Sequence, residues 1–512
     1  MMYTCFVILV SLCIIVRFFL FRQKKDRKLP PGPSFLSSHI ILLTNSLLGI
    51  EPVLRKLKSK YGPLITLSLG SHPIIFVADH ALAHQILIKN GAVVSDRPRI
   101  FRFRTITSAS YGPNWRALRR NLSSVFLHTS RVNSFSWARK WVLGNLVGHL
   151  QKHNKEAEGI MVLEHFRYAI FSLSLIMCFG EKLDECQIQE ILAVQRHLLS
   201  LAVTRKINVY MVFPWLFKIL FRNTWKLYEK LRTDQKQKFM SLIKSERKSL
   251  GKEQVAYIDT LMSLKLPVEE ADNKSDENLT DKALVSMCGE FLNTATDTTT
   301  TTLQWIMANL VMHPHIQSKL YDEIVAVVGP SPQLVPSNLE FESVIDKDDL
   351  QKMPYLKAVV LEGLRRHPPG HLVLPHRVMK DVEVQGYVIP EGATLNFMVG
   401  EMGLDPKVWE DPMEFNPERF LSDDSSNNDV FDITGNKGIK MMPFGVGRRI
   451  CPATDLALLH LEYFVANLIW YFQWTTPYGY HVDLSERVDF TVTMKNPLQA
   501  QILMRARQKV NC

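Results

Sequence analysis

Phe444-Gly445-Val446-Gly447-Arg448-Arg449-Ile450-Cys451-Pro452-Ala453 is the stretch that decides the fold of this 512-residue chain. It places one cysteine after a loop with two glycines and two arginines, directly before an apolar segment with helical spacing. A haem iron bound through a thiolate needs room for the macrocycle, positive charge near its propionates and backbone donors toward the sulfur. Glycines permit a close backbone approach, and an arginine suits a carboxylate. The pattern predicts that Cys451 is an iron ligand, although a single cysteine beside a helix is more often a small buried hydrophobe.

The same stretch resembles the cysteine loop of the cytochrome P-450 superfamily. That loop reads Phe, two residues, Gly, one residue, Arg, one residue, Cys, one residue, and then Gly or Ala. The matching positions are Phe444, Gly447, Arg449, Cys451 and Ala453. The resemblance covers nearly the whole chain, and residues 303–310 and 456–468 look most like the plant microsomal eighty-nine-A subfamily. It implies haem b as the cofactor, with Cys451 as the axial thiolate.

The N-terminus is typical of a membrane anchor. Residues 1–21 are almost wholly apolar, with Arg17 as the one charged residue, and a basic run follows them. The length suits a bilayer span with the basic run left in the cytosol. The positive charge follows the apolar stretch and no small-residue cleavage site comes after it, which favours an uncleaved anchor over a secretory signal. We expect a transmembrane anchor over 1–21, a basic and proline-rich hinge over 22–34, and a haem-thiolate catalytic domain over 35–512. With the resemblance, this predicts a single-pass protein of the endoplasmic reticulum membrane whose catalytic domain is cytosolic.

Composition limits the class of protein further. A hydrophobic content of 46% with 22% charged residues is typical of a globular chain with a large core. The net charge of +11 is dispersed and no nucleic-acid recognition motif accompanies it, so we expect no nucleic-acid partner and attribute the charge to membrane lipid and a redox partner. The 7 cysteines are scattered without disulfide or zinc spacing, which favours a reducing compartment.

Hydrophobic periodicity predicts a mainly α fold with small β-sheets. Residues 64–69 and 74–77 have the character of two short strands in a hairpin, and helical spacing dominates from about Ala81 onward. The longest periodic segment begins at Asp281 and ends near Met312, which predicts one long central helix.

Inside that helix lies Thr294-Ala295-Thr296-Asp297-Thr298-Thr299. An acid beside a hydroxyl in an apolar helix suits oxygen activation, because that chemistry consumes protons. The resemblance assigns Thr298 to the hydroxyl that bonds dioxygen and Asp297 to the acidic relay. The alternative is a threonine run that hydrogen-bonds its own helix backbone. Ala295 stands where the family usually has glycine, and Thr294 where it usually has alanine or glycine, so we expect a narrowed oxygen groove.

Two further sets of residues gain meaning from the resemblance. Glu362 and Arg365 are three apart on one helix face, and the family joins them with Arg419 into a buried ion network that supports the cysteine loop. The propionate contacts carried over from the family come from a helix that begins near Gly112-Pro113, from a later loop and from the cysteine loop itself. They are Trp115, Arg119, His376 and Arg449.

The reaction that the resemblance implies is monooxygenation, with NADPH electrons delivered by NADPH-cytochrome P-450 reductase. The substrate is expected to be a small hydrophobic plant metabolite in a pocket drawn partly from residues 101–110 and 370–374. The pocket residues carried over are Phe291, Ala295, Leu372, Val373 and Val492. Two alternatives stay open: a haem-thiolate isomerase or dehydratase that needs no reductase, and a non-catalytic haem-binding protein.

Overall fold

The computed structural model describes residues 28–45, 49–69, 72–98, 105–153, 159–204, 214–245, 255–267, 277–331, 344–421 and 431–505. The predicted anchor, residues 1–21, and residues 22–27 of the hinge lie outside these residues. The part of the hinge that is described, residues 28–34, is not helical, as its prolines require. It lies along the first strand, where the Thr66 N–H donates to the Pro31 carbonyl at 2.9 Å.

Helices make up most of the fold, which confirms the predicted class. The α-helices are α2 (Phe35–Thr44), α3 (Glu51–Tyr61), α4 (His80–His84), α5 (Pro113–Arg120), α6 (Thr129–Ser134), α7 (Ser136–His153), α8 (Val162–Phe179), α9 (Glu185–Ala202), α11 (Pro214–Leu220), α12 (Arg222–Lys244), α13 (Tyr257–Met262), α14 (Asp281–Met312), α15 (Pro314–Val328), α16 (Lys347–Leu350), α17 (Pro354–Arg366), α18 (Val399–Gly403) and α19 (Thr454–Tyr471). Two π-helical segments, η1 (Gln85–Lys89) and η2 (Asn121–Phe126), extend α4 and α5, and two short 3₁₀ turns are η3 (Pro417–Phe420) and η4 (Gly447–Arg449).

The strands form small separate sheets. They are β1 (Leu64–Leu69), β2 (His72–Val77), β3 (Ile160–Met161), β4 (Lys265–Leu266), β5 (Glu277–Asn278), β6 (His376–Arg377), β7 (Val382–Val384), β8 (Tyr387–Ile389), β9 (Thr394–Phe397), β10 (Phe472–Thr475), β11 (Glu486–Val488), β12 (Val492–Met494) and β13 (Gln499–Met504). The predicted hairpin is confirmed, because β1 and β2 pair antiparallel from Leu64 opposite Val77 to Leu69 opposite His72. The largest sheet has the order β1-β2-β9-β6, with β2 and β9 parallel.

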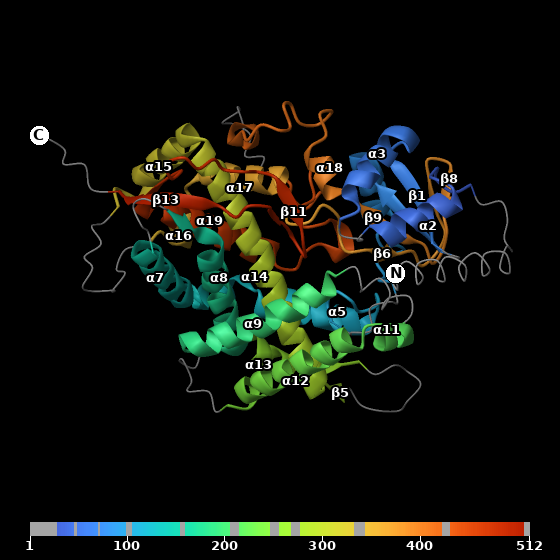
Figure 1. Ribbon diagram of the computed structural model, residues 1–512, viewed down its shortest axis with the longest axis horizontal. Coiled ribbons are helices and arrows are strands. Elements are labelled where there is room, and N and C mark those ends of the chain that lie inside the picture. Colours follow the sequence, from blue (N-terminus) through green and yellow to red (C-terminus); the bar gives the residue numbers. More distant parts are fainter. Residues whose placement is uncertain are drawn as a thin grey trace, which may run out of the picture.

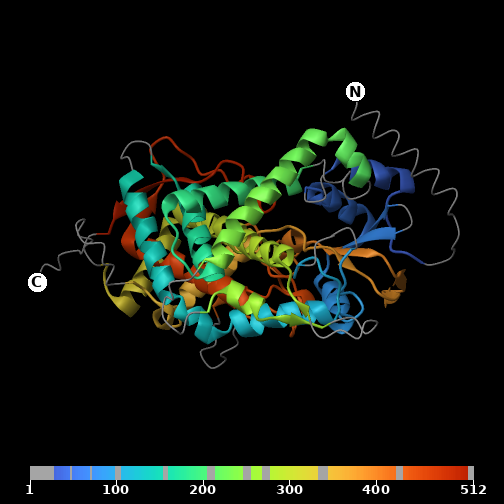
Figure 2. The ribbon, with the colours of Figure 1, turned by 90° about the horizontal axis from the view of Figure 1, so that it is seen from below.

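The largest sheet lies toward one end of the molecule, and most of the long helices lie outside that end (Figures 1 and 2). Both views place the β1-β2-β9-β6 sheet with α2 and α3 at one end of the long axis and α7 and α15 at the other (Figures 1 and 2). The central helix α14 crosses the middle diagonally in Figure 1, with α8 and α19 beside it. Its bounds are those predicted, because the Thr280 side chain caps its first turn by accepting the Ala283 N–H at 3.3 Å.

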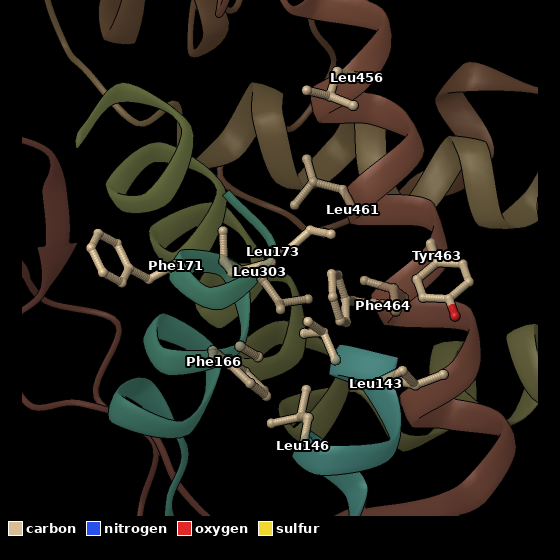
Figure 3. Close-up of a cluster of buried hydrophobic side chains, with 14 of the residues drawn as sticks. Leu143, Leu146, Phe166, Phe171, Leu173, Leu303, Leu456, Leu461, Tyr463 and Phe464 are labelled. Carbon is tan, nitrogen blue, oxygen red and sulfur yellow. The ribbon is translucent and has the colours of Figure 1, made fainter. Parts of the chain in front are cut away.

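The main core lies where α7, α8, α14 and α19 meet. Figure 3 shows Leu143 and Leu146 from α7, Leu173 from α8, Leu303 from α14 and Phe464 from α19 pointing toward one another. Of the described helices, α8 alone is long and apolar enough to cross a membrane, and 78% of its apolar window is buried inside the protein. That burial identifies α8 as a core helix and explains its apolar composition.

Candidate functional site

The cysteine loop is a tight turn fixed by its own backbone. The Cys451 N–H donates to the Phe444 carbonyl at 2.9 Å, and the Ala453 N–H points at the Cys451 Sγ at 3.4 Å. Gly447 has φ +76°, and a Cβ there would lie 2.4 Å from the Leu87 carbonyl oxygen in η1. The loop therefore needs glycine at this position both for its conformation and for the close approach of η1.

Cys451 is half-buried, and its surroundings act on the thiol in opposite directions. Burial raises the pKa of the Cys451 thiol, whereas the Ala453 N–H and the nearby positive charge of Arg119 lower it. One backbone donor and one cation directed at a sulfur are what stabilises a thiolate.

A cluster of arginines surrounds the loop that precedes α5. Arg449 donates to the carbonyls of Ser95 (2.8 Å), Ile106 (3.2 Å) and Ala109 (2.7 Å), and its guanidinium carbon lies 4.3 Å from the centre of the Trp115 ring. The Trp115 indole N–H also donates to the Ile106 carbonyl, at 3.1 Å. Backbone carbonyls therefore already hold these two side chains in place.

The positive charges of this cluster are not neutralised by ion pairs. Burial, followed by the charge of Arg449, lowers the pKa of Arg97 to about 9, and burial lowers the pKa of Arg449 to about 10. Burial also lowers the pKa of His376 to about 3, so its imidazole is neutral, and its Nδ1 bonds the Val94 carbonyl at 2.9 Å. Among the residues that the structure describes, no carboxylate forms a salt bridge with Arg97, Arg119 or Arg449.

This donor set fits a haem. Arg97 is buried and Arg119 and Arg449 are half-buried, and none of the three forms a salt bridge within the described residues. Such cations suit an anionic group, and two propionates supply two negative charges. The Cys451 sulfur lies close enough to Arg119 for their charges to interact, so the anion site and the thiol belong to one region. The candidate haem-binding residues are Cys451, Arg449, Arg97, Arg119 and His376, and the role of each is a prediction.

The predicted ion network is present, and it is buried. Arg365 binds both carboxylate oxygens of Glu362, at 2.6 and 2.7 Å, and neither side chain is exposed. Arg419 Nε and the Asn416 N–H donate to the same carboxylate at 3.2 and 2.8 Å. Four donors therefore surround one acid, and they join α17 to the segment that contains η3.

The network also reaches toward the cysteine loop. Arg365 Nη1 donates to the carbonyls of Gly403 and Pro412, at 2.7 and 2.8 Å. Its guanidinium lies 5.4 Å from the Trp409 ring centre, and the Trp409 indole donates to the Lys440 carbonyl at 3.3 Å. Lys440 shortly precedes the cysteine loop in the chain. A support role for this network stays a prediction, but the contacts provide a physical route for it.

In α14, the threonine hydroxyls bond to the helix itself. Thr298 Oγ1 donates to the Thr294 carbonyl at 2.7 Å, and Thr294 Oγ1 to the Glu290 carbonyl at 2.8 Å, which is the alternative considered from the sequence. Each hydroxyl oxygen keeps lone pairs that can accept a further bond. Thr294, Ala295 and Thr298 are half-buried and lie on one face, whereas most other residues of the helix after Val285 are buried. This face is an accessible part of the middle of α14.

Asp297 lies beside a cation from α8. Its carboxylate is 3.8 Å from Arg167 Nε, and within the described parts of the chain that nitrogen has no hydrogen-bond partner. Burial raises the pKa of Asp297, and the charge of Arg167 opposes this. An aspartate in this setting keeps a proton at a higher pH than an exposed one.

The predicted pocket residues lie in different settings. Phe291 is 7% exposed and packs against Phe126 and Tyr257, with ring centres 5.6 and 5.0 Å apart, so aromatic packing by itself accounts for its position. Leu372 and Val373 follow α17 and are partly buried, and Val492 is buried in β12. Their role in substrate contact stays a prediction, and residues 101–104 of the predicted pocket loop lie outside the described residues.

Two residues that the sequence did not single out are central to the site. Glu290 accepts the N–H groups of Ile106 and Thr107, both at 3.0 Å, and holds the segment 105–109 against α14. Arg97 donates to the Thr107 carbonyl, and to the carbonyls of Leu374 and Pro375, all at 2.9 Å. The basic residue in Arg97-Pro98 was the only sequence signal for the second of them.

Comparison with known proteins agrees with this site. A family model described as Cytochrome P-450 matches residues 30–504. Cytochrome P-450 89A9 of Arabidopsis thaliana is 44% identical over 515 residues, which cover 98% of this chain and 99% of that protein. An isoflavone 2'-hydroxylase of Medicago truncatula is 29% identical over 527 residues, covering 99% and 98%. The resemblance inferred from the sequence is confirmed.

A solved structure shares the fold. A zebra fish cytochrome P-450 determined with progesterone superposes with a TM-score of 0.71, covering 88% of this chain and 98% of that one. At 21% identity this likeness concerns the fold alone.

Proposed function

This chain belongs to the cytochrome P-450 family, and from this premise we propose that it is a haem-thiolate monooxygenase acting on a hydrophobic plant metabolite. The observation that carries the proposal is Cys451, whose sulfur receives the Ala453 N–H beside a cluster of arginines that form no salt bridge among the described residues. Bound haem supplies the iron at which dioxygen is activated. The substrate itself is not specified by these features.

The chain's residues hold the cofactor and its charges. Cys451 is the proposed axial ligand, with Phe444, Gly447 and Ala453 shaping its loop. Arg449, Arg119 and Arg97 are the proposed partners of the propionates. Neutral His376 donates its Nδ1–H to the Val94 carbonyl, so its Nε2 can accept one further hydrogen bond. Trp115 stacks on Arg449 and limits its freedom.

Proton delivery is the proposed task of α14. The raised pKa of Asp297 lets this acid keep a proton to a higher pH than an exposed aspartate, and Arg167 lies 3.8 Å from its carboxylate. Thr298 Oγ1 lies on the half-buried face of α14. Its hydroxyl donates to the Thr294 carbonyl, and its oxygen can still accept a hydrogen bond from another group. The methyl of Ala295 on the same face narrows the oxygen groove relative to the glycine that the family usually has there, and it favours a limited range of substrates.

The proposal includes the partners expected from the sequence. We infer that residues 1–21 anchor the chain in the endoplasmic reticulum membrane, and that NADPH-cytochrome P-450 reductase supplies electrons to a cytosolic domain over 35–512. The net charge of +11 favours association with anionic lipid and with an acidic reductase surface.

Reconstitution with purified reductase tests the reaction class. A monooxygenase consumes NADPH and dioxygen in a manner stimulated by its substrate, and the Asp297→Asn variant should lose coupled product formation while keeping its haem. An isomerase or dehydratase would convert its substrate without NADPH, and a haem-binding protein would convert nothing. Conversion of a metabolite without NADPH would refute monooxygenation.

A further inference from the structure

His371 is a buried histidine between two acids from distant parts of the chain. It is 9% exposed and belongs to the turn that follows α17. Its Nε2 lies 3.1 Å from Glu486 of β11, and its Nδ1 lies 3.6 Å from Glu51 of α3. One imidazole ring therefore joins an N-terminal helix to a C-terminal strand.

The surroundings of His371 favour its charged form. Burial lowers the pKa of His371, but the nearby carboxylates of Glu486 and Glu51 outweigh burial and raise it to about 9. The same contacts lower the pKa of both acids despite their burial. The ring also fits a confined space, because a Cβ on Gly400 would lie 2.9 Å from it. The other charged or titratable groups that face this cluster are Arg55 and Lys58 of α3, Glu401 of α18, and Arg366 and His367 at the end of α17.

The segment that follows His371 is held at both ends. At its far end, Arg97 donates to the carbonyls of Leu374 and Pro375, at 2.9 Å each. Although its carbonyl is held by Arg97, the Leu374 side chain is 46% exposed, whereas Val373 and Pro375 on either side of it are partly buried. An apolar side chain left open between an ionic clamp and the arginine cluster is suited to contact an apolar ligand.

Glu486 fixes a second wall at the same time. Its strand β11 pairs with β12, and the Val492 N–H donates to the Pro369 carbonyl at 2.9 Å. The Val492 carbonyl accepts the Trp305 indole of α14 at 2.8 Å, and His367 stacks on that indole at 4.0 Å. The turn 370–374 and the β11–β12 hairpin therefore meet at the His371–Glu486 pair.

We propose that His371 is a positioning residue: its cationic ring clamps the turn 370–374 to the β11–β12 hairpin, and so sets the shape of the substrate pocket between Leu374 and Val492. This inference rests on the proposed function, since it takes these segments as pocket walls. Loss of the charge on His371 removes the cation shared by the buried Glu51 and the partly exposed Glu486, so the turn and the hairpin separate. Binding of a ligand that reaches the walls then weakens, whereas a ligand small enough to touch only the iron is unaffected.

The test compares wild type, His371→Gln and the matched control His80→Gln. His80 also lies 3.6 Å from a carboxylate, that of Asp405, but it belongs to α4, and its ring bonds the Met402 carbonyl at 3.0 Å rather than either wall. Haem-loaded proteins are titrated with imidazole and with 1-phenylimidazole from about pH 7 to about pH 10. Both ligands bind the iron, but only the phenyl group reaches the pocket walls. The ratio of the two dissociation constants therefore reports contact with the walls and cancels effects at the iron. Hydrogen exchange of residues 370–376 and 486–494 is measured alongside, with no ligand added.

We expect His371→Gln to weaken 1-phenylimidazole binding relative to imidazole about tenfold across the pH range, and to speed exchange in both segments. Wild type and His80→Gln should show that weakening only as the pH passes about 9. If His371→Gln does not fold, the wild-type pH profile decides. Unchanged exchange in His371→Gln, or a wild-type ratio that stays flat to about pH 10, overturns the inference. Absence of a thiolate-type spectrum in wild type would instead overturn the proposed function, and exchange would still test the clamp.

Discussion

Replacing Glu362 by glutamine removes one negative charge from a site with no access to water. Glu362 is unexposed and accepts four hydrogen bonds, two from Arg365 and one each from Arg419 and Asn416. A glutamine amide has one oxygen in place of two, and its NH₂ group would point at guanidinium donors. The variant therefore leaves Arg365 buried without its counter-ion.

The expected cost is about 3–5 kcal/mol, the usual penalty for removing one partner of a buried ion pair. That is a large share of the roughly 5–15 kcal/mol by which domains are stable. Because the network contacts Trp409 and through it Lys440, we expect the loss to appear as haem-poor protein as well as a lower unfolding midpoint. Chemical denaturation and the ratio of haem to protein absorbance measure the two effects.

Glu418→Gln is the matched control, since Glu418 pairs with Lys319 at 2.7 Å but both side chains are about half exposed. We expect that exposed pair to contribute less than about 1 kcal/mol. Replacing Arg365 by methionine in the Glu362→Gln background should restore part of the stability, because it removes the uncompensated charge. Wild-type haem content and stability in Glu362→Gln would refute the role given to this network.

Three other predictions follow from the site. Gly447→Ala must either leave φ +76° or push its Cβ against the Leu87 carbonyl, so we expect purified protein with little haem, measured by the pyridine haemochrome absorbance; full occupancy would contradict this. Arg167→Gln removes the charge that lowers the pKa of Asp297, so the pKa of Asp297 should rise further. The alkaline limb of the turnover-pH profile should then move to higher pH. An unmoved limb would exclude Asp297 as the proton donor. The fold raises the pKa of His371 to about 9, so the stability that its charge contributes is complete below its ordinary pKa of 6.5 and is lost as the pH rises through about 9. The denaturation midpoints of wild type and His371→Gln should therefore converge as the pH passes about 9. A difference between the two midpoints that persists at higher pH would argue against an ionic role for His371.

Local patterns in the sequence were enough to predict the main elements. The bounds of α14 follow from its threonine cap and its apolar spacing, and the β1–β2 hairpin from two short strands around a turn. The pairing of Glu362 with Arg365 was predictable as a helix neighbour, whereas its link to Arg419 came only from family resemblance.

Contacts between distant segments could not be predicted in this way. Arg97 belongs to a loop without periodicity and is buried only because residues 105–109 and 374–375 close over it. Glu290 fits the pattern of an ordinary helix residue, and its importance comes from two backbone N–H groups far away in the chain. His371 needs partners from α3 and β11, and no local rule connects those three positions.

The absorption spectrum of the reduced, carbon monoxide-bound protein tests haem-thiolate ligation most directly, because the position of the Soret band reports the proximal ligand. The Cys451 loop predicts the red-shifted band of a thiolate in wild type and its loss in Cys451→Ala. A wild-type band typical of histidine or of a protonated thiol would contradict thiolate ligation by Cys451.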